Sequence, residues 1–433
     1  MHKSTQPKTK RVFGIFLFEN IKEIWYNIYR RNKKEKKMVL TAKQEECLKV
    51  AVARYRAKEP WTCIAGFAGA GKTTVIRFII SALGLNPEDI AYVAYTGKAA
   101  NVLKQKGCIN ATTAHKLIFE SRPLPNGGFV NIPRTQLEEN YKLIVIDEIS
   151  MLPKNMWNLL LKYKVHILAL GDPFQLPPIS ADDDNQVLNS PHVFLDEIMR
   201  QAKESEIIRL SMHIREGKGL GDFPQSKEQV QIFSPSEIVS GMYEWADQII
   251  CATNRKRIES NTIVRKMLGR GEEPEPGDKI ISLTNHWDCF SLELTALTNG
   301  SIGQLKDFYK TYMALPTYIY PQRNLPILRG TFITEDGETF KDLFIDYQAL
   351  NSGQKTLTPR QEYQIYKSTK INHPAPFDFT YGYAITCWKA QGSQWDKVML
   401  FEERFPFVKE EHARYLYTGI TRAADKLIVI KEN

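Results

Sequence analysis

The sequence contains few cysteines and no long apolar run near its start. Its 433 residues include six cysteines, with no C-x-x-C pair and no zinc-ligand spacing among them. Reduced, mostly structural thiols of a cytosolic protein are therefore expected, and no structural metal is implied. The apolar run Val12–Phe18 is too short to span a bilayer, and no small-residue cleavage site follows it. The sequence thus does not indicate an exported or membrane-spanning protein.

The net positive charge is concentrated in the first residues. The formal net charge is +9, and residues 1–37, with 11 Lys and Arg against 3 Asp and Glu, contribute +8 of it. The remainder is nearly neutral, so a nucleic-acid site there would have to be a local basic groove. We interpret residues 1–38 as a basic N-terminal extension. It is either a dispensable segment before a functional start at Met38, or a surface-seeking helix with Phe18, Ile21, Trp25 and Ile28 at helical spacing.

A glycine-rich stretch between a predicted strand and a predicted helix is the most informative motif. Residues 66–74, GFAGAGKTT, fit the phosphate-binding pattern G-x-x-x-x-G-K-[ST], and an ordinary Gly-rich turn is the alternative. The loop and the helix N-terminus are expected to hold a triphosphate. Lys72 would neutralise its outer charge, and the Thr73 hydroxyl would be a Mg²⁺ ligand. The predicted nucleotide contacts here are Gly66, Gly69, Ala70, Gly71, Lys72, Thr73 and Thr74.

Alternating strands and helices follow this loop. Residues 90–95, 98–106 and 143–146 predict a strand, a helix and a strand, which indicates a parallel α/β sheet. Asp147 and Glu148 come directly after the last strand. We expect Asp147 to bind the water shell of Mg²⁺ and Glu148 to act as the general base. A later strand leads to Gln175, whose amide is suited to sensing a γ-phosphate or orienting the attacking water.

Further motifs resemble those of a known family. GFAGAGKT, then VIDEIS at 145–150 and GDPFQLPP at 171–178, resemble the motifs of superfamily 1 helicases, and more narrowly of RecD-like and Dda-like phage members. The similarity continues through residues 94–100, 111–115, 195–200, 252–255, 386–393 and 415–423. The motifs keep the family's order across residues 41–430, so coincidence is a poor explanation.

The resemblance implies additional nucleotide contacts. Arg200 and Arg422 look like the two arginine fingers that neutralise charge on the γ-phosphate once a second domain closes over it. Gln391 and Gly392 belong to the T-x-x-K-A-Q-G element. Gln44 stands where many helicases place an adenine-reading amide. Gln44 also has a structural explanation, because Thr41 and Gln44 match a helix capping box.

The resemblance also implies contacts to a nucleic-acid strand. The residues concerned are Thr96, Lys98, Thr113, His115, Asn254 and Lys389. For two of them there are structural alternatives, since Thr113 could be a helix N-cap and His115 a satisfied helix histidine. A hairpin with its turn at Asn126-Gly127 stands about where family members carry a strand-separating pin. Phe129 or a neighbour would form its tip, and a plain surface hairpin is the alternative.

The expected fold is α/β, with two RecA-like P-loop domains of parallel sheets flanked by helices. A small β-hairpin insert and a small β-barrel insert, the latter rich in Thr, Tyr, Gly and Pro, complete it. The expected divisions are residues 39–190 for RecA-like domain 1, with the pin-like insert at about 118–137, 191–280 for the first part of domain 2, 281–372 for the barrel-like insert, and 373–433 for the second part of domain 2.

By resemblance, such a chain uses ATP and Mg²⁺ to move 5′ to 3′ along single-stranded DNA and to unwind duplex DNA. Expected partners are single-stranded and fork DNA, with a single-strand-binding protein or a replisome component as further candidates, and no membrane. A monomer in a bacterial or phage-infected host cytoplasm is expected. The alternative is a DNA-stimulated ATPase that remodels protein–DNA complexes without processive unwinding. A small-molecule P-loop kinase would need neither the second arginine motif nor the T-x-x-K-A-Q-G element.

Overall fold

The computed structural model describes most of the chain after the N-terminal extension. The described residues are 40–123, 129–178, 185–199, 204–224, 226, 228–292, 296–358, 360–362, 364–365, 376–404 and 408–432. The chain divides into two compact units, Met1–Glu45 and Glu46–Asn433, and the division falls inside the helix α2 (Ala42–Arg56). All sheets belong to the second unit. Within the described ranges, no helix is long and apolar enough to cross a membrane.

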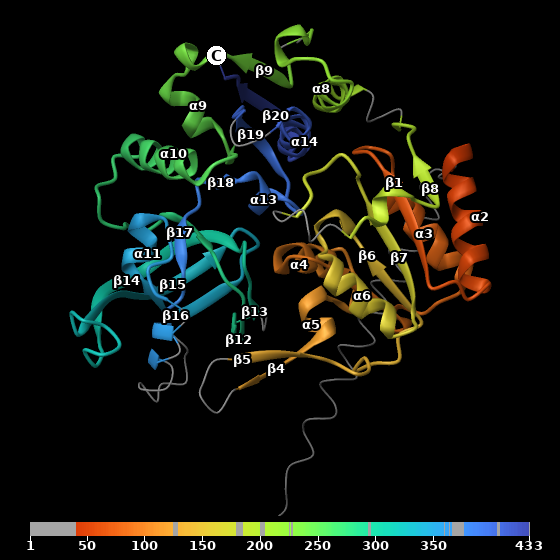
Figure 1. The fold of residues 1–433 in the computed structure, drawn as a ribbon. Coiled ribbons are helices and arrows are strands. Elements are labelled where there is room, and N and C mark those ends of the chain that lie inside the picture. The colour runs from red at the N-terminus through yellow and green to blue at the C-terminus, as the bar shows by residue number, and fades with distance from the viewer. Residues whose placement is uncertain are drawn as a thin grey trace, which may run out of the picture. The chain divides into compact units, whose positions relative to one another are not determined.

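The first sheet is parallel throughout, with the strand order β3-β2-β6-β7-β1-β8 (Figure 1). Its strands are β1 (Trp61–Gly66), β2 (Ile90–Ala94), β3 (Ala111–Thr113), β6 (Leu143–Ile146), β7 (His166–Gly171) and β8 (Val193–Leu195). Because β8 pairs with β1, this sheet includes residues after 190, where we expected the first domain to end. The P-loop, Asp147 and Asp172 follow β1, β6 and β7, so they share the carboxyl edge of one sheet.

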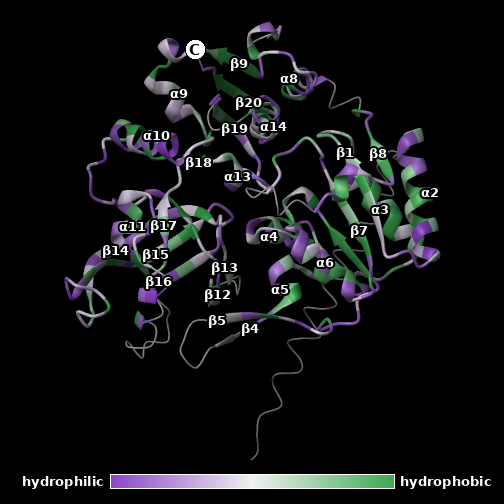
Figure 2. Ribbon diagram, viewed as in Figure 1, coloured by the Kyte–Doolittle hydropathy of each residue, from purple (hydrophilic) through white to green (hydrophobic). Residues whose placement is uncertain are grey.

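Both faces of this sheet are covered. Along β6, Ile144 and Ile146 pack in a hydrophobic cluster with residues of α6, whereas Leu143 and Val145 pack in a second cluster with residues of α3. Burial on both faces explains the continuous apolar runs in the sequence. In Figure 2, the strand β7 of this sheet is hydrophobic. The helices beside the first sheet are α3 (Lys72–Leu83), α4 (Gly97–Gln105), α5 (Ala114–Ile118) and α6 (Lys154–Lys162).

An antiparallel hairpin interrupts the first sheet's sequence at the place where the pin-like insert was expected. Its strands are β4 (Phe119–Pro123) and β5 (Phe129–Pro133), and Pro123 pairs with Phe129. Residues 124–128, which include the predicted turn, lie outside the described residues.

The second alternating block forms a parallel sheet of its own, with the order β18-β10-β19-β20-β9. Ile250 packs in a cluster with residues of α8 and α14, and its neighbours Ile249 and Cys251 pack in another with residues of α9 and α10. The strands are β9 (Val230–Phe233), β10 (Gln248–Cys251), β18 (Ala384–Thr386), β19 (Trp395–Phe401) and β20 (Ala423–Ile430). The helices are α8 (Glu206–Arg215), α9 (Ser240–Trp245), α10 (Asn254–Met267), α13 (Cys387–Ala390) and α14 (Lys409–Ile420).

A third, antiparallel sheet has the order β16-β15-β14-β11-β17. In the edge strand β16, Ile345 forms a β-bridge with Phe377, which lies just before the other edge strand β17, so the two edges meet. Phe332, Phe340 and Phe379 fill its core. Its elements are β11 (Lys279–Ser282), β14 (Ile302–Ala314), β15 (Asn324–Thr334), β16 (Thr339–Asp346), β17 (Phe379–Tyr381) and α11 (Tyr347–Ser352), with a separate hairpin of β12 (His286–Phe290) and β13 (Ala296–Leu297).

Candidate nucleotide site and strand-contact residues

The P-loop joins β1 to α3 with a backbone that favours glycine. Gly69 and Gly71 have φ angles of 77° and 79°, in the left-handed region where a Cβ atom is strained. Gly66 has no room for a side chain, because an added Cβ would lie 2.9 Å from the Cβ of Leu195. Ala70 is buried beside them. The loop therefore has the geometry on which phosphate cradles depend.

Lys72 folds its side chain back onto this loop. Its Nζ atom donates to the carbonyl oxygens of Gly66 at 2.6 Å and of Phe67 at 3.1 Å. The ammonium group is therefore held within the P-loop. Thr73 is exposed in the first turn of α3, and the backbone N–H of Thr74 donates to the Gly71 carbonyl at 3.0 Å.

Asp147 and Glu148 follow β6 with contrasting surroundings. Asp147 Oδ1 accepts the Glu148 N–H at 3.0 Å. Glu148 has a φ of 54°, and its Oε2 atom is buried without a hydrogen-bond partner among the described residues. Burial raises the pKa of the Glu148 carboxyl, opposed by the positive charge of Arg422. A carboxylate with a raised pKa is suited to accept a proton from water.

Arg422 reaches this carboxylate from the second sheet. Its Nη1 lies 3.8 Å from Glu148 Oε1. The guanidinium is 7% exposed and donates to the Thr418 carbonyl at 3.1 Å and the Ser393 carbonyl at 3.3 Å. Because these partners belong to its own side of the site, they hold the Arg422 guanidinium in place without a bound nucleotide.

Asp172 and Tyr417 form a second connection, to which the sequence analysis assigned no role. The Tyr417 hydroxyl donates to Asp172 Oδ2 at 2.5 Å and accepts the Ala68 N–H of the P-loop at 2.9 Å. Asp172 is 1% exposed, and burial raises the pKa of its carboxyl although Lys72 and Tyr417 oppose the shift. Both residues lie inside recognised motifs. Their pairing, however, joins residues 245 positions apart and has no local sequence signal.

Gln391 and Gly392 lie close to the residue after Gln175 and to Glu148, respectively. The Gln175 Oε1 atom is buried without a hydrogen-bond partner among the residues that the structure describes. Gln391 Nε2 donates to the Leu176 carbonyl at 2.9 Å. Gly392 has a φ of 76°, and a Cβ there would lie 3.5 Å from Glu148 Oε2. The T-x-x-K-A-Q-G element thus packs directly against the predicted general base.

The predicted strand contacts on the first sheet also have structural roles. Thr96 Oγ1 accepts the Ala99 N–H, and Thr113 Oγ1 accepts the Lys116 N–H, both at 3.2 Å, so each threonine caps a helix. The N-cap alternative for Thr113 is therefore observed. A capping hydroxyl still has a proton to donate, which leaves a phosphate contact open. His115 stacks loosely between Tyr95 and Phe119, and burial lowers its pKa.

The two predicted lysine contacts are engaged by the third sheet. Lys98 Nζ lies 3.5 Å from Glu335 Oε2 and 4.9 Å from the centre of the Trp395 ring. Lys389 Nζ donates to Asn299 Oδ1, and burial lowers the pKa of this ammonium to about 8. On the second sheet, Asn254 is exposed, and its Oδ1 accepts from Arg257 Nε at 3.1 Å.

For three further predicted residues, the structure does not test the predicted contact. Arg200 lies outside the described residues. Phe129 is placed at the start of β5, but its side chain and the neighbouring tip lie outside the description. Gln44 belongs to the unit Met1–Glu45, where both capping-box bonds with Thr41 are present, at 3.1 Å and 3.3 Å. The capping box is thus confirmed, and the adenine contact stays a prediction.

Thr73 and Asp147 fit Mg²⁺ by the chemistry of their donors. A hydroxyl and a carboxylate are hard oxygen ligands, and Mg²⁺ bound to nucleotide phosphates needs few protein ligands. Within the described ranges, no group of three or more His, Cys, Asp or Glu residues is placed to hold a metal by itself. A metal at this site would therefore depend on the nucleotide.

Two sequence families match the chain. A family described as an AAA domain matches residues 39–234, and a family described as a UvrD-like helicase C-terminal domain matches residues 381–430. The first match contains the P-loop and Gln175, and the second contains Gln391 and Arg422. The matched segments thus contain both halves of the site.

Individual relatives are distant. The chain is 22% identical over 392 residues to the ATP-dependent RecD2 DNA helicase of Deinococcus radiodurans, covering 84% of this chain and 46% of that protein. It is 23% identical over 254 residues to the ATP-dependent DNA helicase dda of Enterobacteria phage T4, covering 53% and 57%. The chain therefore spans about half the length of these curated relatives.

A solved structure resembles nearly the whole chain. It is a Pif1 helicase from Bacteroides in complex with ADP-AlF3 and ssDNA, with a TM-score of 0.54 and 19% sequence identity, covering 92% of this chain and 93% of that one. This similarity concerns the fold, and it agrees with two RecA-like domains built on the two parallel sheets.

Proposed function

Because this chain belongs to the superfamily 1 helicases similar to RecD, Dda and Pif1, we propose that it is an ATP-dependent DNA helicase that moves 5′ to 3′ on a single strand. The observation that carries the proposal is that the Tyr417 hydroxyl contacts both Ala68 of the P-loop and Asp172. A nucleotide in the P-loop would therefore meet groups from both parallel sheets. Nucleotide binding and hydrolysis could then close and open the two domains built on these sheets, and a motor requires such a movement.

In this proposal the chain's own residues perform the ATP chemistry in defined roles. Lys72 moves from the loop carbonyls to the phosphates, and Glu148 takes a proton from the attacking water. Gln175 orients that water, and Arg422 with Arg200 neutralises charge developing at the γ-phosphate. Mg²⁺, when held by Thr73 and Asp147, supplies charge neutralisation at the β- and γ-phosphates. The remaining P-loop residues, Gly66, Gly69, Ala70, Gly71 and Thr74, with Gln391 and Gly392, complete the nucleotide site.

The strand would lie across both sheets, held mainly through its backbone. Thr96, Thr113 and His115 contact it on the first sheet, and Asn254 on the second. Lys98 would leave Glu335, and Lys389 would leave Asn299, so that both lysines could contact phosphates of the strand. Contacts to phosphate and sugar position a strand without selecting its sequence, so little sequence specificity is expected. Phe129 would stack on or wedge between bases at the fork.

The test offers 5′-tailed and 3′-tailed duplexes to the wild type and to Lys72→Ala. Unwinding of the 5′-tailed substrate alone, with ATP and only by the wild type, is the expected result. Unwinding of the 3′-tailed substrate alone would overturn the direction. ATPase activity stimulated by single strands without any unwinding would favour a remodeller of protein–DNA complexes. ATPase activity unaffected by DNA, with no displacement, would overturn the motor proposal.

The expected partners follow from this activity. Fork DNA is the substrate, and a single-strand-binding protein or a replisome component is the kind of protein that such a motor would meet. We propose that it acts as a monomer in the cytoplasm. Light scattering with and without a fork substrate would test the monomer.

A further inference from the structure

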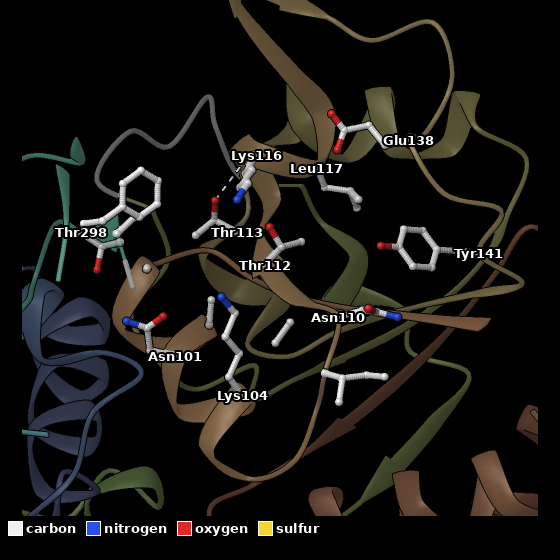
Figure 3. A pocket seen from close by; sticks show the side chains of 16 residues that line it. Asn101, Lys104, Asn110, Thr112, Thr113, Lys116, Leu117, Glu138, Tyr141 and Thr298 are labelled. Atoms are coloured by element: carbon white, nitrogen blue, oxygen red, sulfur yellow. Dashed lines mark hydrogen bonds between the residues drawn. The ribbon is translucent and has the colours of Figure 1, made fainter. Parts of the chain in front are cut away.

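A pocket of about 260 Å³ lies outside the nucleotide site, between α4, β3, α5 and the hairpin β12–β13 (Figure 3). Lys104 comes from α4 and Lys116 from α5, and both are exposed. In Figure 3 their side chains point into the same part of the pocket as Thr112 and Thr113. Phe290, at the end of β12, also lines the pocket.

The two lysines form no ion pair with any described residue, although Glu138 lines the same pocket. Burial lowers the pKa of Lys104, the positive charge of Lys116 lowers it further, and the charge of Glu338 opposes the shift. Two like charges in one pocket repel, so an anion placed between them would be stabilised by both.

Two large apolar side chains that line the pocket are exposed. Phe290 of β12 is 56% exposed, and Ile109, between α4 and β3, is 46% exposed. The hairpin is closely packed against α4, because a Cβ added to Gly97 would lie 2.1 Å from the Cβ of Thr298. The hairpin that carries Phe290 therefore packs closely on the helix that carries Lys104, and both residues line one pocket with Lys116.

We propose that this pocket binds one phosphate of a single DNA strand between Lys104 and Lys116, with an adjacent base stacked on Phe290. The inference rests on the proposed function and adds a site to it. Paired cations next to an exposed ring suit a polynucleotide, which offers a phosphate and a base at a fixed spacing. Thr113 lines the same pocket, so the new site would continue the contacts expected from the motifs. Lys104, Lys116 and Phe290 belong to none of those motifs.

The first test measures binding of a labelled 15-nucleotide oligothymidylate to Lys104→Gln/Lys116→Gln in the full chain. We expect about tenfold weaker binding than the wild type at low salt. The slope of log K against log salt should fall by about 0.7 to 1.4, the effect of one or two lost phosphate contacts on a single strand. The matched control is Lys154→Gln/Lys162→Gln, which removes two exposed lysines of α6 outside the pocket. It should bind like the wild type, and circular dichroism checks that both variants are folded.

The second test isolates stacking. Phe290→Ala should weaken binding of the oligothymidylate about fivefold or more, because stacking of one base on an aromatic ring stabilises a complex by that order. It should not change binding of an abasic oligomer of the same length, which has phosphates but no base to stack. Equal effects on both oligomers would overturn the stacking part of the inference.

The outcomes separate this inference from the proposed function. If the wild type binds the oligomer and responds to it by ATP hydrolysis, while the lysine variant binds equally well, only the pocket is refuted. If the wild type does not bind DNA, both proposals fail. Displacement of the oligomer by inorganic phosphate at constant ionic strength should be stronger for the wild type than for the lysine variant, because free phosphate and DNA would compete for the lysine pair. Equal displacement from both proteins would overturn the inference.

Discussion

At the residue scale, the Tyr417 hydroxyl joins the P-loop to α14, a helix that packs on the second sheet. In Tyr417→Phe, the buried Asp172 carboxylate and the Ala68 N–H lose this partner. We expect the free energy of unfolding to fall by about 1–3 kcal/mol. We also expect the Kd for ATP to rise, because Ala68 lies in the phosphate-binding loop. Denaturant unfolding and nucleotide titration measure the two effects.

Tyr415→Phe is the matched control for this variant. The Tyr415 hydroxyl donates to the Phe401 carbonyl, a bond made within the second sheet's own core. The control should lose stability without a change in ATP affinity. A Tyr417→Phe variant that behaves in the same way would show that the hydroxyl stabilises the fold only.

A second prediction at this scale concerns Lys389 and pH. Burial lowers the pKa of Lys389 from 10.5 to about 8. A phosphate contact needs the ammonium form, so the affinity for single-stranded DNA should fall as pH rises through about 8. Folding stability should change in the opposite sense: between pH 8 and 10.5 the unfolded chain binds the proton that the folded chain lacks, which favours the folded state as pH rises. Lys389→Arg stays charged and should flatten the affinity profile, measured by fluorescence anisotropy. An unchanged profile would exclude Lys389 from DNA binding.

At the element scale, Glu335, in the turn between β15 and β16, contacts residues of three other elements. Glu335 lies 3.5 Å from Lys98 of α4 and 2.7 Å from Lys279 of β11, and it accepts from Trp395 Nε1 of β19 at 3.4 Å. A DNA phosphate would compete with this carboxylate for Lys98. Glu335→Gln should therefore bind single-stranded DNA more tightly, by about two- to fivefold at low salt, with the gain lost at high salt.

Glu362→Gln is the control for the Glu335 variant. Glu362 pairs with Lys355 at 2.5 Å, and among the described residues no ion pair joins either side chain to α4. Its substitution should leave the DNA affinity unchanged. Weaker DNA binding by Glu335→Gln would mean that Glu335 supports DNA binding instead of competing with DNA.

At the scale of the whole molecule, a buried ion cluster ties the third sheet to the second. Asp278 is fully buried and accepts from Arg265 of α10 at 3.1 Å and from Arg270 at 2.6 Å. Asp278→Ala leaves both arginines without their partner, so we expect a loss of about 3–5 kcal/mol in unfolding free energy. The third sheet should then unfold separately, and urea unfolding followed by two probes should give two transitions.

The exposed pair between Lys310 and Glu273 provides the comparison for Asp278. Its atoms are 3.4 Å apart, but both side chains are well exposed. Glu273→Gln should therefore cost less than about 1 kcal/mol and keep a single transition. Equal losses in the two variants would show that burial of Asp278 is not what couples the sheets.

The sequence by itself determined the local features of this protein. The P-loop pattern, the apolar strands followed by Asp147 and by Gln175, and the capping box of Thr41 and Gln44 are all written in neighbouring residues. Each depends on glycine conformation, alternate burial or a hydrogen bond over three positions, and such interactions need only a short segment. The same holds for the family motifs, which keep their spacing within a segment.

Only the tertiary structure decided which distant residues meet. The pair of Asp172 and Tyr417, the contact of Lys98 with Glu335, and the pocket shared by Lys104 and Lys116 each join different elements, with no regular spacing to reveal them. Likewise, the short apolar run of β8 does not by itself indicate which of the two parallel sheets the strand joins. Side-chain partners across elements are set by how helices and strands pack, and packing depends on the whole buried surface at once.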